Sequence, residues 1–155
     1  MITFLPYSDF RRSAESLDKK RLGNQRAEAL WIAKGVIKGN THPVVHLWHG
    51  WLKALIEYGK MVCTVWRERG YTDDMWPDFY LLDPGGELIL PKWLGSWKLH
   101  SSHRANLIRK EPKIYRALGW TETLQFTYFW PKPRTGMVLM PLDAAPVTPR
   151  PAPAS

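Results

Sequence analysis

The sequence predicts an all-α domain built on three main helices. Two long segments carry apolar residues at spacings of three and four, which is the period of an amphipathic helix. A third, shorter segment follows a pair of serines, a residue type that commonly caps helix N-termini. The one apolar run that could form a short strand, Glu87–Leu90, has no clear partner strand.

The first predicted helix starts near Ser13 and ends between Lys34 and Lys38, after a short extended arm at residues 3–7. Its central part, residues 17–30, reads as one continuous amphipathic helix. The Gly-Asn pair at positions 39 and 40 is typical of a helix C-terminus.

The second predicted helix runs from about Val44 to Arg69, with Pro43 in its first turn, where a missing N–H costs nothing. Gly50 and Gly59 interrupt this helix, each at a cost of about 1 kcal/mol relative to alanine. We expect them to allow the close approach of a neighbouring helix.

Beyond residue 70 the pattern is less regular. Residues 71–98 contain several Trp, Pro and Gly and are predicted to form a long aromatic loop. The third helix is expected at residues 103–110, capped by Ser101 or Ser102, with a further turn at residues 113–118. We assign residues 1–140 to a single domain and residues 141–155 to a disordered, proline-rich tail.

The composition favours a polyanionic partner. The chain has 22 Lys and Arg against 14 Asp and Glu, a net charge of +8 and a pI near 9.7. No apolar run approaches the roughly 20 residues of a membrane-spanning helix, and the N-terminus lacks signal-peptide features. The single cysteine, Cys63, is expected to be a buried helix thiol. We therefore expect a cytoplasmic protein whose polyanionic partner is a nucleic acid and not a membrane.

Positive charge gathers in two regions. One cluster lies on the first predicted helix and the other around the third, where Glu111 is the one acidic residue within 98–116. The first cluster comprises Lys19, Lys20, Arg21 and Arg26, and the second Lys98, Arg104, Arg109, Lys110, Lys113 and Arg116. Such an excess favours phosphate contacts, with a solubilising surface as the alternative.

Glu28 is the candidate catalytic residue. Arg21, Gln25 and Glu28 lie at i, i+4 and i+7 and share one helix face, which Leu17 and Ile32 extend. Polar groups at the centre of an apolar stripe are costly to bury without partners. One interpretation is a carboxylate that acts on a sugar–base bond; the other is a surface ion pair, which spacing alone would favour.

The five histidines do not predict a metal site. They are His42, His46, His49, His100 and His103, and they occur without an H-E-x-x-H motif or a Cys–His set. Helix capping, core hydrogen bonds or phosphate contacts are the expected roles. We expect neither a metal nor an organic cofactor.

Several motifs resemble the pyrimidine-dimer DNA glycosylases of the phage endonuclease V type, and more closely their uncharacterised bacterial and phage relatives. The similarity covers about residues 3–118 in the same order. It is carried by Phe4–Phe10, Leu17–Glu28, His42–Pro43, Trp66–Tyr71, His100–Arg104, Arg109–Pro112 and Tyr115.

The resemblance implies three packed helices with the N-terminal segment between them. It also implies a DNA repair glycosylase that excises a damaged or modified, pyrimidine-dimer-like base from double-stranded DNA, and we expect this protein to be a nucleoid-associated monomer. In this family an N-terminal α-amine attacks the sugar C1′ and a helix glutamate assists, so Glu28 takes the place of that glutamate. With the charge clusters, it assigns DNA contacts to Lys20, Arg21, Gln25, Arg26, His103, Arg104, Arg109, Lys110 and Tyr115.

Residue 2 departs from the family pattern, in which a small processed residue becomes the new N-terminus. A bulky Ile2 normally prevents removal of Met1, so the amine either belongs to Met1 or is absent from the site. The alternatives are a glycosylase with abasic-site lyase activity through Met1 or Ile2, and a monofunctional glycosylase in which Glu28 activates water. Two further alternatives are a non-catalytic DNA-binding protein of the same fold and a polyanion-binding scaffold for a protein partner.

Overall fold

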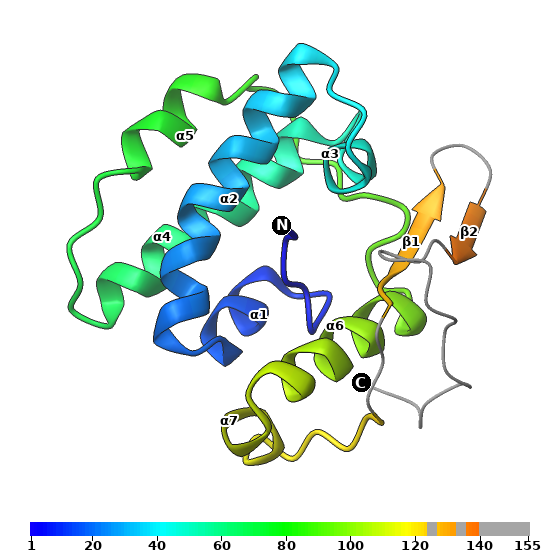
Figure 1. Ribbon diagram of the computed structural model, residues 1–155. Coiled ribbons are helices and arrows are strands. Elements are labelled where there is room, and N and C mark those ends of the chain that lie inside the picture. Colours follow the sequence, from blue (N-terminus) through cyan, green and yellow to red (C-terminus); the bar gives the residue numbers. More distant parts are fainter. Residues whose placement is uncertain (124–126, 133–135, 140–155) are drawn as a thin grey trace. The chain divides into compact units, whose positions relative to one another are not determined.

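The computed structural model describes residues 1–123, 127–132 and 136–139 (Figure 1). Over these residues the fold is all-α, as predicted, with one added pair of short strands. The elements are α1 (Phe10–Ser16), α2 (Lys19–Lys38), α3 (Pro43–Leu47), α4 (Leu52–Glu68), α5 (Trp76–Leu82), α6 (Trp97–Lys110), α7 (Pro112–Arg116), β1 (Phe129–Lys132) and β2 (Gly136–Leu139).

The chain forms two compact units. Unit 1 comprises Met1–Phe4 and Phe10–Pro91, and unit 2 comprises Leu5–Asp9 and the residues from Lys92 onward. The predicted single domain over residues 1–140 stays a prediction. The proposed tail at 141–155 lies outside the described residues. Among the residues that the structure describes, no helix is long and apolar enough to cross a membrane.

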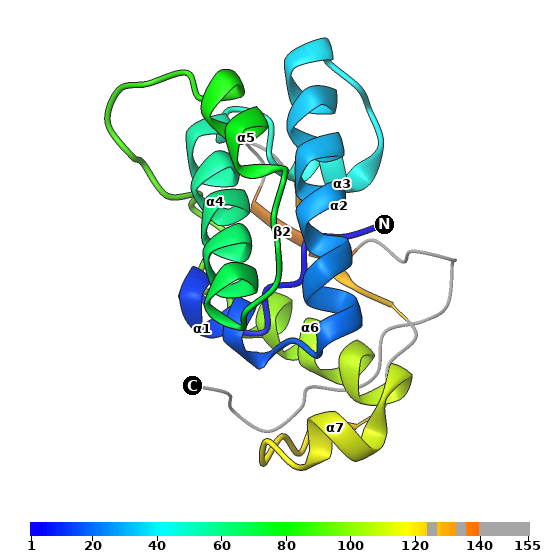
Figure 2. The ribbon, with the colours of Figure 1, turned by 90° about the vertical axis from the view of Figure 1, so that its left-hand side faces the viewer.

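In unit 1, α2 and α4 pack side by side, and α1, α3 and α5 pack against this pair (Figures 1 and 2). The facing sides of the two long helices are apolar and fully buried, with Leu22 and Ile32 on α2 and Leu55 and Val62 on α4. The 3.6-residue period in the sequence therefore identifies the core of unit 1.

The first predicted helix is two helices, so the prediction of one continuous helix through residues 17–30 is wrong at its start. Asp18 adopts an extended backbone conformation, and its side chain accepts a hydrogen bond from the backbone N–H of Arg21. An aspartate in this role is a strong N-cap, and it begins α2 at Lys19. The predicted C-terminus is confirmed, because Gly39 follows Lys38 with a φ of 74°.

The second predicted helix is also divided. It ends as α3 at Leu47 and resumes as α4 at Leu52, with Gly50 between them at a φ of 83°. That left-handed conformation is strained for residues with a side chain, so Gly50 turns the chain instead of continuing the helix. The prediction of an unbroken helix over residues 44–69 is therefore wrong.

Gly59, in contrast, has the predicted role of allowing close packing. A Cβ atom at this position would overlap the ring of Phe79, a fully buried residue of α5. Helix α5 itself lies inside the segment predicted to be a loop, so the expectation for residues 71–98 is wrong over 76–82. A seven-residue helix with one buried apolar residue leaves too weak a periodic signal to be recognised.

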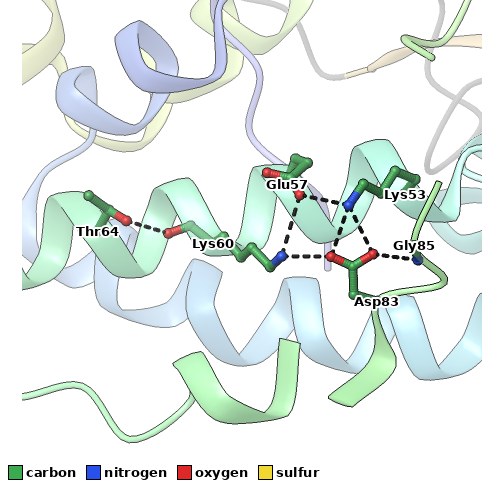
Figure 3. A network of polar contacts seen from close by, with 6 residues as sticks. All are labelled: Lys53, Glu57, Lys60, Thr64, Asp83 and Gly85. Carbon is green, nitrogen blue, oxygen red and sulfur yellow. Dashed lines mark hydrogen bonds and ion pairs between the residues drawn. The ribbon is translucent and has the colours of Figure 1, made fainter. Parts of the chain in front are cut away.

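A carboxylate just beyond α5 ties this helix to α4 (Figure 3). Asp83 accepts hydrogen bonds from Lys60 Nζ at 2.6 Å, Lys53 Nζ at 3.0 Å and the Gly85 backbone N–H at 2.9 Å. Burial raises the pKa of Asp83, but these donors outweigh it and hold the pKa well below its usual range. Asp83 therefore stays ionised over the pH range in which the protein would be handled.

Cys63 lies on α4 and is buried, as predicted. Burial, together with the neighbouring Asp73 carboxylate, raises the pKa of its thiol to about 12. The thiolate is therefore scarcely populated at neutral pH.

In unit 2, α6 begins six residues earlier than predicted. Its N-cap is Ser96, whose side chain accepts from the backbone N–H of Leu99, whereas the predicted caps Ser101 and Ser102 lie within the helix. Ser102 instead uses its hydroxyl to bind the start of β1, accepting from the N–H of Phe129 at 3.1 Å. The sequence analysis therefore identified the helix but not its first turns.

The strands β1 and β2 form an antiparallel hairpin in which Phe129 lies opposite Leu139. The sequence analysis did not predict them. Helix α7 follows α6 after a break at Pro112, close to the predicted turn at 113–118. Its Tyr115 is buried and stacks on Trp120 with a ring-centroid distance of 5.3 Å.

The packing at Gly59 predicts the effect of a single methyl group. Alanine is about 1 kcal/mol better than glycine in a helix interior. Overlap with the Phe79 ring should outweigh this gain, since overpacking typically costs about 1–3 kcal/mol. We expect Gly59→Ala to lower the free energy of unfolding in urea denaturation. Adding Phe79→Leu should recover part of the loss; a Gly59→Ala variant more stable than the wild type would contradict this packing.

Candidate functional site

Residues 1–4 form an extended segment that lies against α2 in unit 1 and pairs with no β-strand among the described residues; we call it the N-terminal strand (Figures 1 and 2). Ile2, Thr3 and Phe4 are buried, whereas Met1 is 51% exposed. An extended segment without a neighbouring strand must satisfy its backbone N–H and C=O groups by other means. In this protein the partners are side chains of α2 and α4.

Gln25 of α2 is the principal partner. Its Nε2 donates to the carbonyl oxygen of Ile2 at 2.9 Å, and its Oε1 accepts from the backbone N–H of Phe4 at 2.9 Å. The same Nε2 also donates to Glu28 Oε2 at 2.8 Å. The orientation of the amide follows from its neighbours, because the Phe4 N–H requires an acceptor and the other two oxygens require donors.

Tyr58 of α4 completes this network from the other side. Its buried hydroxyl lies 2.6 Å from Gln25 Oε1 and 2.9 Å from the carbonyl oxygen of Phe4, both of which are acceptors. Burial and the negative charge of Glu28 raise the pKa of Tyr58 well above its ordinary value. The hydroxyl therefore remains a protonated donor at neutral pH.

A second anchor holds the middle of the strand. The indole N–H of Trp48 donates to the Thr3 hydroxyl at 3.0 Å, and both residues are fully buried. Anchors at Ile2, Thr3 and Phe4 leave the strand little freedom, and Met1 extends from this fixed segment towards solvent.

The network brings the predicted acid close to the Ile2 peptide group. Glu28 is half-buried on α2, one turn beyond Gln25, and shares the Gln25 Nε2 donor with the Ile2 carbonyl. The carboxylate and the Ile2 peptide are thus separated by no more than two hydrogen-bond lengths. A carboxylate close to the N-terminal segment could stabilise a developing positive charge on a bound substrate or act as its general acid or base.

The predicted DNA contacts on α2 differ in their environments. Lys20 is exposed, while the side chain of Arg21 is 15% exposed and pairs with Asp18. Arg26 donates to Asp73 at 2.7 Å and stacks on Trp66 at 4.5 Å. The structure therefore presents Lys20 to solvent and engages the two arginines within unit 1.

In unit 2, Arg109 and Lys110 are exposed in the last turn of α6, whereas three other predicted DNA contacts are buried. Tyr115 stacks inside the unit. Arg104 donates to Glu122 at 3.0 Å and to the Pro6 carbonyl at 2.6 Å. In this structure these buried side chains contact interior groups, so phosphate contact stays a prediction for the exposed cations.

His103 and His100 hydrogen-bond the backbone N–H and the carbonyl oxygen of the same residue, Leu5. The N–H of Leu5 donates to His103 Nδ1 at 2.9 Å, and the Leu5 carbonyl lies 2.8 Å from His100 Nδ1. Since the Gly95 N–H donates to His100 Nε2 at 2.8 Å, the His100 proton is on Nδ1 and points to Leu5. Burial, assisted by the charge of Arg104, lowers the pKa of both histidines.

These histidines predict a pH-dependent stability. Their folded-state pKa values lie below the ordinary value of 6.5, so the unfolded chain binds more protons at mildly acidic pH. The free energy of unfolding should be highest above pH 6.5, decrease as the pH falls below it, and level off below the folded-state pKa values. Denaturation across pH 4–8, an interval set by the ordinary histidine pKa of about 6.5, measures this.

A matched pair of variants tests the assignment. His103→Asn retains an acceptor for the Leu5 N–H without titrating, so its stability should vary less with pH in this interval. His46 is exposed, and His46→Asn should leave the slope unchanged. Equal slopes for wild type and His103→Asn would contradict the role of His103.

Within the described ranges, no group of three or more His, Cys, Asp or Glu side chains is arranged to hold a metal ion. The sequence analysis did not identify Thr3, Trp48 and Tyr58 as part of the site. In the sequence, Tyr58 continues the apolar spacing of the second predicted helix, and nothing local indicates that its hydroxyl is needed. No local motif signals these contacts, because each joins residues that are more than 30 positions apart.

Comparison with known proteins gives one finding. Residues 1–76 match the family model described as pyrimidine dimer DNA glycosylase, which confirms the resemblance to this family. The matched region contains the N-terminal strand, Gln25, Glu28 and Tyr58. No curated protein and no solved structure matches the chain.

Proposed function

We propose that this chain excises a damaged or modified base from duplex DNA, with Glu28 as the catalytic carboxylate. The premise is its match to the pyrimidine dimer DNA glycosylases. One observation carries the proposal: Gln25 Nε2 is bonded both to Glu28 and to the Ile2 carbonyl. This shared donor supports a site in which a helix glutamate and the chain terminus, the family's two catalytic groups, act together.

The chemistry requires a positive charge at the sugar to be stabilised. As the bond between C1′ and the base nitrogen breaks, its electron pair leaves with the base and C1′ becomes electron-poor. A carboxylate at Glu28 would stabilise that charge and accept the proton of the attacking nucleophile. Extrusion of the nucleotide from the duplex would give access to C1′.

We further propose that the nucleophile is the α-amine of Met1. Ile2 is bulky and 5% exposed, so it fills a buried position, whereas Met1 is half-exposed and can reach a bound substrate. An α-amine loses its proton at lower pH than a lysine side chain, which leaves more of it nucleophilic. Its attack on C1′ displaces the base and releases one amine proton. Opening of the C1′–O4′ bond, with a second amine proton passing to O4′, gives an imine, and removal of a 2′ proton then expels the 3′ phosphate, which is the lyase step.

Duplex binding is supported by charge. The net charge of +8 supplies a general attraction for phosphates, and Lys20, Arg109 and Lys110 are exposed cations on α2 and α6. We expect binding to weaken steeply with added salt.

Glu28→Gln tests the catalytic role. The amide keeps the size of the side chain but removes its charge and basicity, so we expect base excision to fall by about 100- to 10,000-fold. The measurement is strand cleavage of ultraviolet-irradiated duplexes after alkaline treatment, with DNA binding followed in parallel. Unchanged excision by Glu28→Gln would contradict the role, and binding without cleavage by the wild type would favour a non-catalytic DNA-binding protein.

Borohydride trapping on an abasic duplex tests the nucleophile. We expect a covalent adduct, and peptide mapping should locate it on Met1. The control is a chain whose α-amine has been acetylated, which should give no adduct. Excision without any adduct would indicate a monofunctional glycosylase in which Glu28 activates water.

A further inference from the structure

We propose that Gln25 is a positioning residue that holds the Glu28 carboxylate and the N-terminal strand in one fixed arrangement. The inference rests on the proposed function, because it explains how the acid and the chain terminus stay together. It assigns a role to a buried side chain that would not itself touch the substrate.

All hydrogen-bonding groups of the Gln25 amide have partners. A side-chain amide offers two N–H donors and one oxygen with two acceptor sites. Both donors are engaged, by Ile2 and Glu28, and the oxygen faces the Phe4 N–H and the Tyr58 hydroxyl. With the residue 1% exposed, water cannot replace any of these partners.

Other residue types cannot make the same four hydrogen bonds. A glutamate at position 25 has no donor for Ile2 or Glu28 unless it binds a proton, and a methionine of similar length has neither donor nor strong acceptor. Asparagine carries the same groups one methylene nearer the backbone, out of reach of the strand. The site therefore requires glutamine chemistry at this distance from α2.

Gln25 and Glu28 lie one turn apart on a 20-residue helix, so their backbones are fixed relative to each other. A hydrogen bond to an ionised carboxylate is short and strong, and here its donor is itself held by the strand. The orientation of Glu28 is thus coupled to the position of the residues that follow Met1.

Tyr58 sets which way the amide faces. Its protonated hydroxyl lies 2.6 Å from Gln25 Oε1, which keeps the oxygen on the side of α4 and Nε2 on the side of Glu28. Tyr58→Phe should therefore weaken the arrangement without removing any group from the Glu28 side.

The closing experiment first compares Gln25→Met with the wild type. A misplacement of about 1 Å in a catalytic group can cost about 100-fold in rate, so we expect kcat for base excision to fall by about that factor. The Kd for duplex DNA should stay within about threefold of the wild type, because no exposed cation is changed. Asp83→Asn perturbs the separate α4–α5 contact and serves as the control for general destabilisation; its kcat should be unchanged.

Gln25→Glu provides a pH signature. When the new carboxyl group is protonated it can donate to Glu28 as the amide does, and when it ionises the two carboxylates repel each other. We expect its kcat relative to the wild type to be highest near pH 5 and to fall towards pH 8, an interval in which paired carboxyl groups commonly titrate. For Gln25→Met the ratio should not depend on pH in this way.

The exchanged pair, Gln25→Glu with Glu28→Gln, separates folding from catalysis. The amide now at position 28 can donate to the carboxylate at position 25, so the melting temperature should recover relative to Gln25→Glu at pH 8. Excision should remain absent, because no carboxylate occupies position 28.

The outcomes distinguish this inference from the proposed function. If the wild type cleaves and Glu28→Gln does not, but Gln25→Met retains full kcat, the positioning role is overturned while the function stands. If the wild type cleaves no duplex, the function fails, and the bond is read from NMR signals of the Gln25 side-chain amide. In the wild type those signals should shift with pH as a carboxyl group titrates, and in Glu28→Gln they should not. Signals that change neither with pH nor on the Glu28→Gln substitution would overturn the inference.

Discussion

The architecture depends on one constraint: an extended N-terminal segment is buried in a helical protein. Such a segment has no strand beside it, so side chains must satisfy its backbone polar groups. Within unit 1, Gln25 and Tyr58 hydrogen-bond the backbone of residues 2 and 4, and Trp48 hydrogen-bonds the Thr3 hydroxyl. Residues 5 and 6 are satisfied within unit 2 by His103, His100 and Arg104. These contacts explain why polar side chains are buried on otherwise apolar helix faces.

The same constraint connects stability with chemistry. The Gln25 amide that hydrogen-bonds the backbone of the N-terminal strand also hydrogen-bonds Glu28. The groups proposed to act on DNA are therefore placed by contacts that the fold requires. In unit 2 the buried histidines are neutral, and their ring nitrogens act as one donor and one acceptor towards Leu5. A change at any of these positions should therefore affect folding and activity together, and only measurements of both can separate them.

The sequence predicts the helical class, the core face of α2 and α4, the C-terminus of α2 and the close packing at Gly59. These follow from periodicity and glycine chemistry, which are local. The breaks at Asp18 and Gly50 were missed because apolar spacing continues across them, and α5 because it is short. Tyr58 and Trp48 could not be recognised as site residues, since the strand that needs their polar atoms is remote in sequence. Glu28 was identified by resemblance, as spacing alone favoured a surface ion pair.

The buried thiol on α4 has a practical consequence. A cysteine whose pKa is about 12 and whose sulfur is shielded from solvent reacts only slowly with maleimide or iodoacetamide reagents at neutral pH. Cys63 is the only cysteine in the chain, so a new cysteine on an exposed position of α2 or α6 would be the single reactive one. With one such cysteine introduced in each unit, fluorophores or spin labels can be attached to both units without altering the native core, and the distance between the two labels can be measured directly.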